Sequence, residues 1–106
     1  MFTMRKGTAP IIEFTLPFST ELVAKAKVII KYKGGSKLTK YAKAEDFDGN
    51  TIRVQLSQEE TFLFDCNSAA KVLLRVLTTN GDPLVSDVYD VFIEECFDDE
   101  VLTHED

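Results

Sequence analysis

The fold of this chain is decided by the run Leu56-Ser57-Gln58-Glu59-Glu60-Thr61 and by the later run Leu74-Arg75-Val76-Leu77-Thr78-Thr79-Asn80-Gly81. In the first run, Ser57 and Glu60 have the spacing of a capping box, in which each side chain accepts a hydrogen bond from the backbone N–H of the other residue. We therefore expect a short helical crossover over residues 58–64. The second run reads as the end of an apolar strand followed by a tight turn, because Asn-Gly favours positive φ.

Alternation of apolar and polar residues predicts the strands around these two runs. The clearest case is Lys25–Lys33, where Ala26, Val28 and Ile30 face one side and lysines face the other. Gly34-Gly35-Ser36 then turns the chain, so this strand and the next are expected to form a hairpin. The expected strands are Pro10–Leu16, Lys25–Lys33, Lys37–Lys43, Thr51–Leu56, Ala69–Thr78 and Leu84–Cys96.

Two of these strands constrain the architecture further. Ala69–Thr78 is apolar on nearly both faces and is expected to be central, whereas Leu84–Cys96 is long enough to bend or to change sheets. The pattern contains no βαβ unit and no long segment of helical period. About six to eight strands with one short helical crossover are typical of an all-β, Ig-like antiparallel β-sandwich.

The length of 106 residues predicts one domain, which we place at residues 1–97, followed by an acidic and flexible C-terminal tail at 98–106. No apolar run approaches the ~20 residues of a membrane span. The first six residues have no apolar core for export, so we expect synthesis in the cytoplasm. Cys66 and Cys96 lie far apart in sequence, which fits free thiols better than a disulfide and leaves open whether they meet.

Charge is segregated along the chain. Residues 25–43 contain seven lysines and no acid, whereas residues 94–106 contain seven acids and no Lys or Arg. We therefore propose a candidate interaction surface built from the basic hairpin and the acidic end: Lys25, Lys27, Lys31, Lys33, Lys37, Lys40, Lys43, Asp98, Asp99 and Glu100. The acidic end of one copy docking on the lysine face of another would give rings or tubes. The alternatives are that the tail folds back on its own hairpin or stays free.

Catalytic and metal sites have little support in the sequence. The only histidine, His104, lies in the tail, and a general base needs a fixed position near its substrate. Asp46, Asp48 and Asn50 alternate as at the start of a calcium loop, but the glycine and the closing glutamate that an EF-hand needs are absent. We expect no catalytic residue, no metal and no cofactor, and no small-molecule substrate is indicated.

The lysine hairpin also suggests a carbohydrate- or nucleic-acid-binding module, because lysines bind phosphates and tyrosines stack on bases. Several observations make nucleic acid the weaker reading. Tyr32 falls on the inward face by alternation, residues 25–43 contain no arginine, and the whole chain is acidic with a net charge of −6. A membrane partner is not indicated.

Several runs, in this order, resemble a group of small proteins encoded in the virion-structure modules of tailed phages and prophages of Gram-positive bacteria. They are Arg5–Pro10, Leu16-Pro17, Val28–Lys33, Leu56–Thr61, Arg75–Thr78 with Gly81, Ser86-Asp87 and Glu100–Leu102. The resemblance implies a non-enzymatic structural or adaptor protein, located in the virion tail region and acting through contacts with other virion proteins. It implies no site residue. This chain departs from the family at Leu73-Leu74, where a glutamine is common, and in the density of its lysines.

Overall fold

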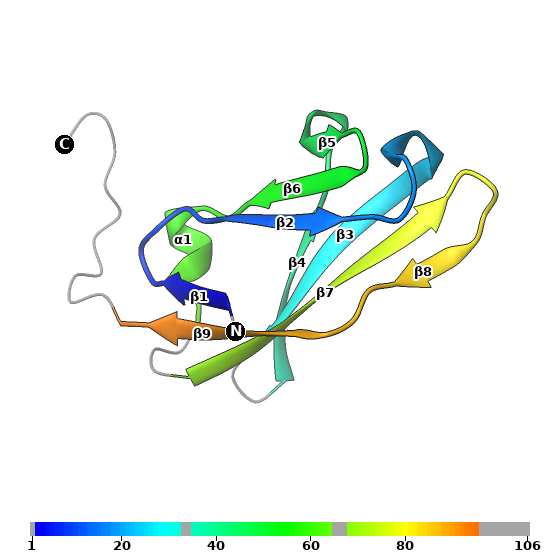
Figure 1. Ribbon diagram of the computed structural model, residues 1–106. Helices are drawn as coiled ribbons and strands as arrows, with labels where there is room; N and C mark the ends of the chain where they lie inside the picture. Colours follow the sequence, from blue (N-terminus) through cyan, green and yellow to red (C-terminus); the bar gives the residue numbers. More distant parts are fainter. Residues whose placement is uncertain (1, 33–34, 65–67, 96–106) are drawn as a thin grey trace.

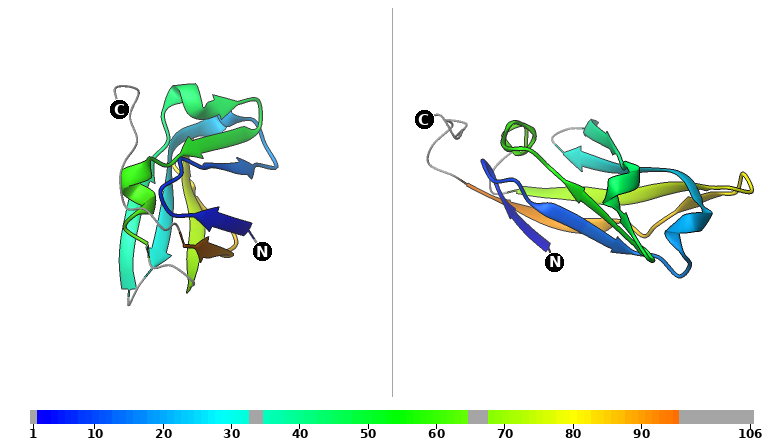
Figure 2. Two further views of the ribbon diagram at one scale, coloured as in Figure 1. Left: turned by 90° about the vertical axis from the view of Figure 1, so that its left-hand side faces the viewer. Right: turned by 90° about the horizontal axis from the view of Figure 1, so that it is seen from above.

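Two β-sheets pack face to face in the computed structural model, which describes residues 2–32, 35–64 and 68–95 (Figure 1, Figure 2). The larger sheet has six strands in the order β1-β9-β7-β3-β4, with β8 also pairing with β7. The smaller sheet has three strands in the order β2-β6-β5. The predicted all-β sandwich is therefore confirmed.

The elements of the larger sheet are β1 (Phe2–Arg5), β3 (Val23–Tyr32), β4 (Ser36–Tyr41), β7 (Ser68–Thr78), β8 (Pro83–Val85) and β9 (Tyr89–Glu94). Those of the smaller sheet are β2 (Ile11–Thr15), β5 (Phe47–Asp48) and β6 (Thr51–Gln55). Among the described residues, the connections include the short helices η1 (Thr20–Leu22), η3 (Ala44–Asp46) and α1 (Gln58–Thr61). Within the described part of the chain, no helix has the length and apolar character needed to cross a membrane.

The core forms because alternation places one apolar row of each strand between the sheets. In the larger sheet, Val28 of β3 lies opposite Leu74 of β7, and Ile30 lies opposite Val72. All four side chains are buried. The smaller sheet adds its own alternate residues, which are Ile12, Phe14, Ile52 and Val54. The predicted central strand, β7, pairs with β3 on one side and with β8 and β9 on the other.

The C-terminal strand differs from the prediction. The stretch expected as one strand from Leu84 is divided into β8 and β9, and both pair with β7 in the same sheet. The interruption falls at Ser86, whose Oγ accepts a hydrogen bond from the backbone N–H of Leu74 at 2.9 Å. A side-chain oxygen thus takes the place of a ladder carbonyl, and the chain bulges between the two strands. The predicted end of the strand, Cys96, lies outside the described residues.

One strand pair departs from the antiparallel prediction. The first strand, β1, runs parallel to β9, with Phe2 opposite Val91 and Arg5 opposite Glu94. The Arg5 guanidinium forms an ion pair with the Glu94 carboxylate at the end of this pair. The parallel pair places β1 at the edge of the larger sheet, where its Met4 side chain is buried in the core.

The helical crossover closes one end of the sandwich and is shorter than expected. Ser57 Oγ accepts from the Glu60 N–H at 3.1 Å, and Glu60 Oε1 accepts from the Ser57 N–H at 2.7 Å, so the predicted capping box is present. The helix ends at Thr61, whose buried Oγ1 accepts from the Gly7 N–H and donates to the Thr8 carbonyl. These bonds fix the chain between β1 and β2 against α1.

Candidate interaction surface

The outer face of the larger sheet, which points away from the smaller sheet, carries rows of cations. Lys27 of β3 lies directly opposite Arg75 of β7 and Tyr41 of β4. Lys31 lies directly opposite Lys71 of β7 and Lys37 of β4. We call the six cations of this surface the cationic face: Lys25, Lys27, Lys31, Lys37, Lys71 and Arg75.

Most cations of the cationic face have no ion-pair partner among the described residues. Lys71 forms an ion pair with Asp90 of β9 at 2.7 Å. The other five cations form no ion pair with any described residue. Like charges directly opposite each other across two strands are destabilising, by roughly 0.2–1 kcal/mol for each pair. The fold therefore carries a concentration of positive charge that its own described residues do not neutralise.

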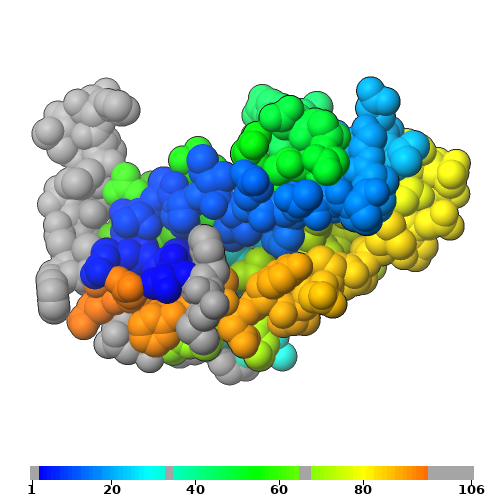
Figure 3. All heavy atoms as spheres, viewed as in Figure 1, coloured from blue at the N-terminus to red at the C-terminus, as the bar shows by residue number. Residues whose placement is uncertain are grey.

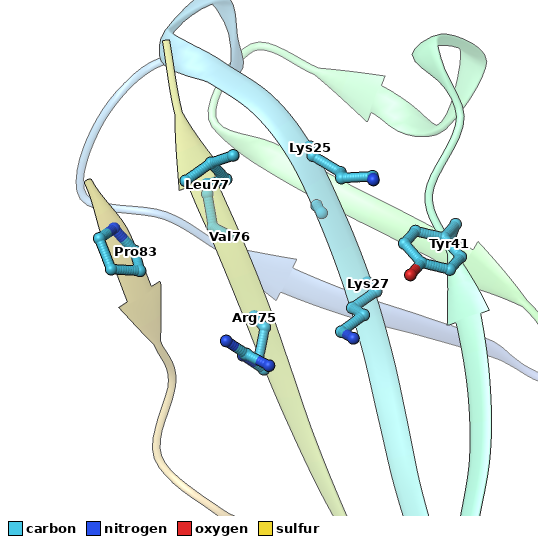
Figure 4. A pocket seen from close by; sticks show the side chains of 8 residues that line it. Lys25, Lys27, Tyr41, Arg75, Val76, Leu77 and Pro83 are labelled. Carbon is cyan, nitrogen blue, oxygen red and sulfur yellow. The ribbon is translucent and has the colours of Figure 1, made fainter. Parts of the chain in front are cut away.

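A shallow hollow of about 230 Å³ lies within the cationic face (Figure 4). Lys25, Lys27 and Arg75 project around it, with the Tyr41 ring on one side and the apolar Leu77 on another. The two ammonium nitrogens lie 5.3 Å and 5.6 Å from the centre of the Tyr41 ring, within the range of cation–π attraction. The tyrosine thus holds lysine side chains at the surface and leaves their charge available to an anionic group.

An apolar row separates the cations. Ile29 of β3 lies opposite Leu73 of β7, and both side chains are half-buried between the row of Lys27 and the row of Lys31. Val85 of β8, opposite Arg75, is 60% exposed. The outer face of the larger sheet therefore carries both positive charge and apolar contact area.

Lys40 does not belong to the cationic face, although it was predicted there. It lies opposite Val28, so its side chain points toward the smaller sheet. Its Nζ donates to the Gln55 carbonyl at 2.6 Å and to Glu60 Oε1 at 2.8 Å. The reason is the period of the strand: Lys37 and Lys40 are an odd number of residues apart and point to opposite faces. Lys40 instead connects the two sheets.

The Lys40 contact changes the ionisation of Glu60. Burial of the Glu60 carboxyl raises its pKa, but hydrogen bonds from Lys40 and Ser57 and the positive charge of Lys40 outweigh this effect. The net result is a pKa below the ordinary glutamate value. The carboxylate therefore stays charged and keeps both the helix cap and the link between the sheets.

The remaining residues of the predicted interaction surface are not part of the cationic face. Lys43 is exposed, but it lies beyond the end of β4 and precedes η3. Lys33 of the hairpin, and Asp98, Asp99 and Glu100 of the acidic end, lie outside the described residues.

Sequence reasoning missed Lys71 and Arg75 as members of the surface. Both stand at odd positions of β7 and so share one face of that strand. The alternation of β7 indicated that Lys71 and Arg75 share a face. Only the antiparallel pairing of β7 with β3 shows that this face is also the face of the β3 lysines.

The expected turn chemistry accounts for Asp46, whereas the Asp48 carboxylate is bound by the Arg53 side chain of β6. Asp46 Oδ2 accepts from the Lys43 N–H at 2.8 Å, and Asp48 Oδ2 accepts from Arg53 at 3.1 Å. Among residues 2–32, 35–64 and 68–95, no group of three or more His, Cys, Asp or Glu side chains is placed to hold a metal ion. His104, Cys66 and Cys96 lie outside these ranges.

Comparison with known proteins gives no family for the chain. The sequence matches no protein-family model and no curated protein.

Proposed function

We propose that this chain is a non-enzymatic structural or adaptor protein of a tailed phage or prophage, and that it works through protein–protein contacts. The observation that supports the proposal most is the cationic face. Its like-charged pairs, Lys27 with Arg75 and Lys31 with Lys37, cost folding energy and are not compensated by described carboxylates. A surface kept at such a cost fits a role in binding better than a role in stability.

The chemistry of the surface indicates an acidic protein partner. Positive side chains surround the apolar contacts of Ile29 and Leu73, so a matching surface would combine carboxylates with apolar residues. Complementary charge accelerates association and fixes its orientation. The acidic end of a second copy, residues 94–106, has this composition, with seven acids and with Val101 and Leu102. Such head-to-tail contact between unlike surfaces produces rings or tubes.

The location in a virion tail region rests on the resemblance of the Leu56–Thr61 and Arg75–Thr78 runs to small phage proteins. Both runs have structural roles in the fold. The first caps the crossover, and the second lies in the central strand. The resemblance therefore supports a shared fold and, through it, the assignment to a virion structural module.

Nucleic acid is the alternative partner, and one observation favours it. Tyr41 is 51% exposed and stands beside Lys25, Lys27 and Arg75, so a base could stack on the ring while cations contact phosphates. The hollow contains an arginine, which the hairpin sequence alone lacks. The overall charge of −6 opposes this reading.

Light scattering coupled to size exclusion over a salt series tests the proposal. The full chain and a chain ending at Glu95 are compared, with circular dichroism to show that both are folded. We expect the full chain to assemble at low salt and to dissociate at high salt, while the shortened chain stays monomeric. Monomers of both chains under all conditions would contradict self-assembly. Retention of an oligothymidine by the full chain would favour the nucleic-acid alternative.

A further inference from the structure

The cationic face contains two charged rows with an apolar row between them. The rows cross β3 and β7 in register, and we name them by their residues on these strands: the Lys27 row (Lys27 and Arg75), the apolar row (Ile29 and Leu73) and the Lys31 row (Lys31 and Lys71). A strand rises about 3.3 Å for each residue, so the two charged rows, four residues apart along β3, are about 13 Å apart. A partner that contacts both charged rows must place its acids at this separation, with an apolar group midway.

An extended segment meets this spacing with the pattern acid-x-apolar-x-acid, where x is any residue. Its alternate side chains share one face, and residues four apart are about 13 Å apart, as they are in β3. In an α-helix, residues four apart are separated by only about 6 Å along the axis. The spacing of the charged rows therefore favours an extended partner segment. The pattern is symmetrical, so it fits the face in either chain direction.

The acidic end of the chain contains this pattern. Glu95, Phe97 and Asp99 alternate, so an extended segment presents the two carboxylates and the ring on one side. Within residues 94–106, this is the one place where a large apolar residue stands between two acids in this spacing. Residues 96–106 lie outside the described part of the chain, and the match is one of sequence with the surface of the larger sheet.

The same copy cannot supply this segment to its own cationic face. Strand β9 runs in the direction of β3, because both are antiparallel to β7, and it passes the Lys31 row at Asp90. Glu95 therefore lies about 16 Å beyond the Lys31 row, on the side away from the Lys27 row. Arg5 donates to the Glu95 carbonyl at 2.6 Å and holds it there. Figure 3 shows the yellow turn after β7, which follows the Lys27 row, and the orange end of β9 at opposite ends of the molecule.

We propose that Glu95, Phe97 and Asp99 of a second copy bind across the cationic face as an extended segment, an inference that rests on the proposed function of this face. One carboxylate contacts the Lys27 row, the other contacts the Lys31 row, and the ring covers the apolar row. Most cations of this face have no described ion-pair partner, so the carboxylates meet charge that the fold leaves available. Each copy offers both the segment and the face, so the contact is head-to-tail.

Fluorescence anisotropy of labelled peptides with the full chain tests this proposal. The native-order peptide is residues 94–106 with Cys96→Ser. The exchanged peptide is the same with Phe97 and Asp98 exchanged, so composition and charge are identical. We expect the exchanged peptide to bind about tenfold more weakly at low salt, because its ring no longer shares a face with the two acids. The acidic end of the protein competes equally with both peptides and leaves their ratio unchanged.

Variants of the full chain locate the segment on the face. Ile29→Thr removes apolar surface, keeps a β-branched residue, and should reduce the difference between the two peptides to about threefold or less. Lys31→Gln should weaken the native-order peptide by about threefold or more. Lys43→Gln is the matched control, because Lys43 is exposed and lies outside the cationic face, and it should change binding by less than about twofold. Leu73→Thr replaces Ile29→Thr if circular dichroism shows that the latter does not fold.

Two results would overturn this proposal and leave the proposed function standing. Equal binding of the two peptides would mean that the face attracts acidic chains by charge alone. Equal weakening by Lys31→Gln and Lys43→Gln would mean that the segment does not reach the Lys31 row. Binding of neither peptide would overturn this proposal together with self-assembly through the acidic end.

Discussion

The two faces of the larger sheet are built from the same strands and differ in every other respect. On the inner face, residues such as Val28 and Leu74 meet across β3 and β7 and are buried beneath the smaller sheet. On the outer face, Lys27 meets Arg75 and Lys31 meets Lys71. The one lysine that points inward from β4, Lys40, is hydrogen-bonded to Glu60, whereas most outward cations have no described partner.

This difference separates what the sandwich needs to fold from what it presents to other molecules. Inner residues gain free energy by leaving water, and a cation on that side is tolerated only with its partner. Outer residues contribute little to stability and, where like charges face each other, reduce it. Substitutions on the two faces should therefore have opposite effects on folding and on binding.

The largest expected effect comes from the inner face. Leu74→Ala should lower the free energy of unfolding by about 2–5 kcal/mol, because a side chain that is only 2% exposed leaves a cavity. Urea denaturation measures the change. Its neighbour Leu73, half-buried on the outer face, is the matched control, and Leu73→Ala should cost about 1 kcal/mol or less. Equal losses would remove the distinction between the faces.

The inward charge pair should show the next largest effect, and its size should depend on pH. Glu60→Gln should lower the free energy of unfolding by about 1–2 kcal/mol at neutral pH, because it weakens charged hydrogen bonds with Lys40 and Ser57.

The sign of the pH dependence follows from the lowered pKa of Glu60. The stabilisation is present above the pKa that this carboxyl has in the unfolded chain, and it is lost as the pH falls through the folded pKa. Urea denaturation between neutral and acidic pH should show the wild type and Glu60→Gln converging in acid. A constant difference would mean that the contact does not depend on the charge of Glu60.

A charge reversal on the outer face should act in the opposite direction. Arg75→Glu places a carboxylate opposite Lys27 and should raise the free energy of unfolding by roughly 0.2–1 kcal/mol. Thermal unfolding at low salt measures this, and added salt should reduce the gain. Arg53→Glu is the control, since Arg53 is bonded to Glu13 and Asp48, and its reversal should destabilise. Destabilisation by Arg75→Glu would show that the cationic face contributes to folding.

The smallest expected effect is at Lys71, the cation of the outer face that forms an ion pair with a described residue. Lys71→Met loses the exposed ion pair with Asp90 and also the repulsion from Lys31, so the free energy of unfolding should change by less than about 0.5 kcal/mol. Asp90→Asn loses the pair and keeps the repulsion, so it should cost slightly more. Chemical denaturation of both variants gives the comparison. A larger loss for Lys71→Met would mean that this ion pair is worth more than exposed pairs usually are.

Much of the fold follows from local patterns in the sequence. The alternation in Val23–Tyr32, the capping box at Ser57 and the turn at Gly81, where φ is +87°, each depend on neighbouring residues alone. Two features depend on distant contacts instead. The strand Phe2–Arg5 is too short to show a period, and its parallel partner is at the other end of the chain. The interruption at Ser86 requires the Leu74 N–H to lie beside its hydroxyl.

The candidate surface, like the fold, was predictable only where it depends on neighbouring residues in the sequence. The lysines of β3 were placed correctly by alternation, but Lys40 was assigned by its proximity in sequence and not by its strand face. Arg75 could be joined to the surface only once the pairing of β7 with β3 was known.

The most direct test of the central claim is an NMR titration that maps where an acidic segment binds. The chain ending at Glu95 is titrated with a peptide of residues 94–106, and backbone amide shifts are followed at two salt concentrations. The account predicts shifts at Lys25, Lys27 and Arg75, with binding at least about tenfold weaker at the higher salt. It also predicts that Arg75→Glu weakens the binding. Shifts confined to the smaller sheet, or no shifts at all, would contradict it.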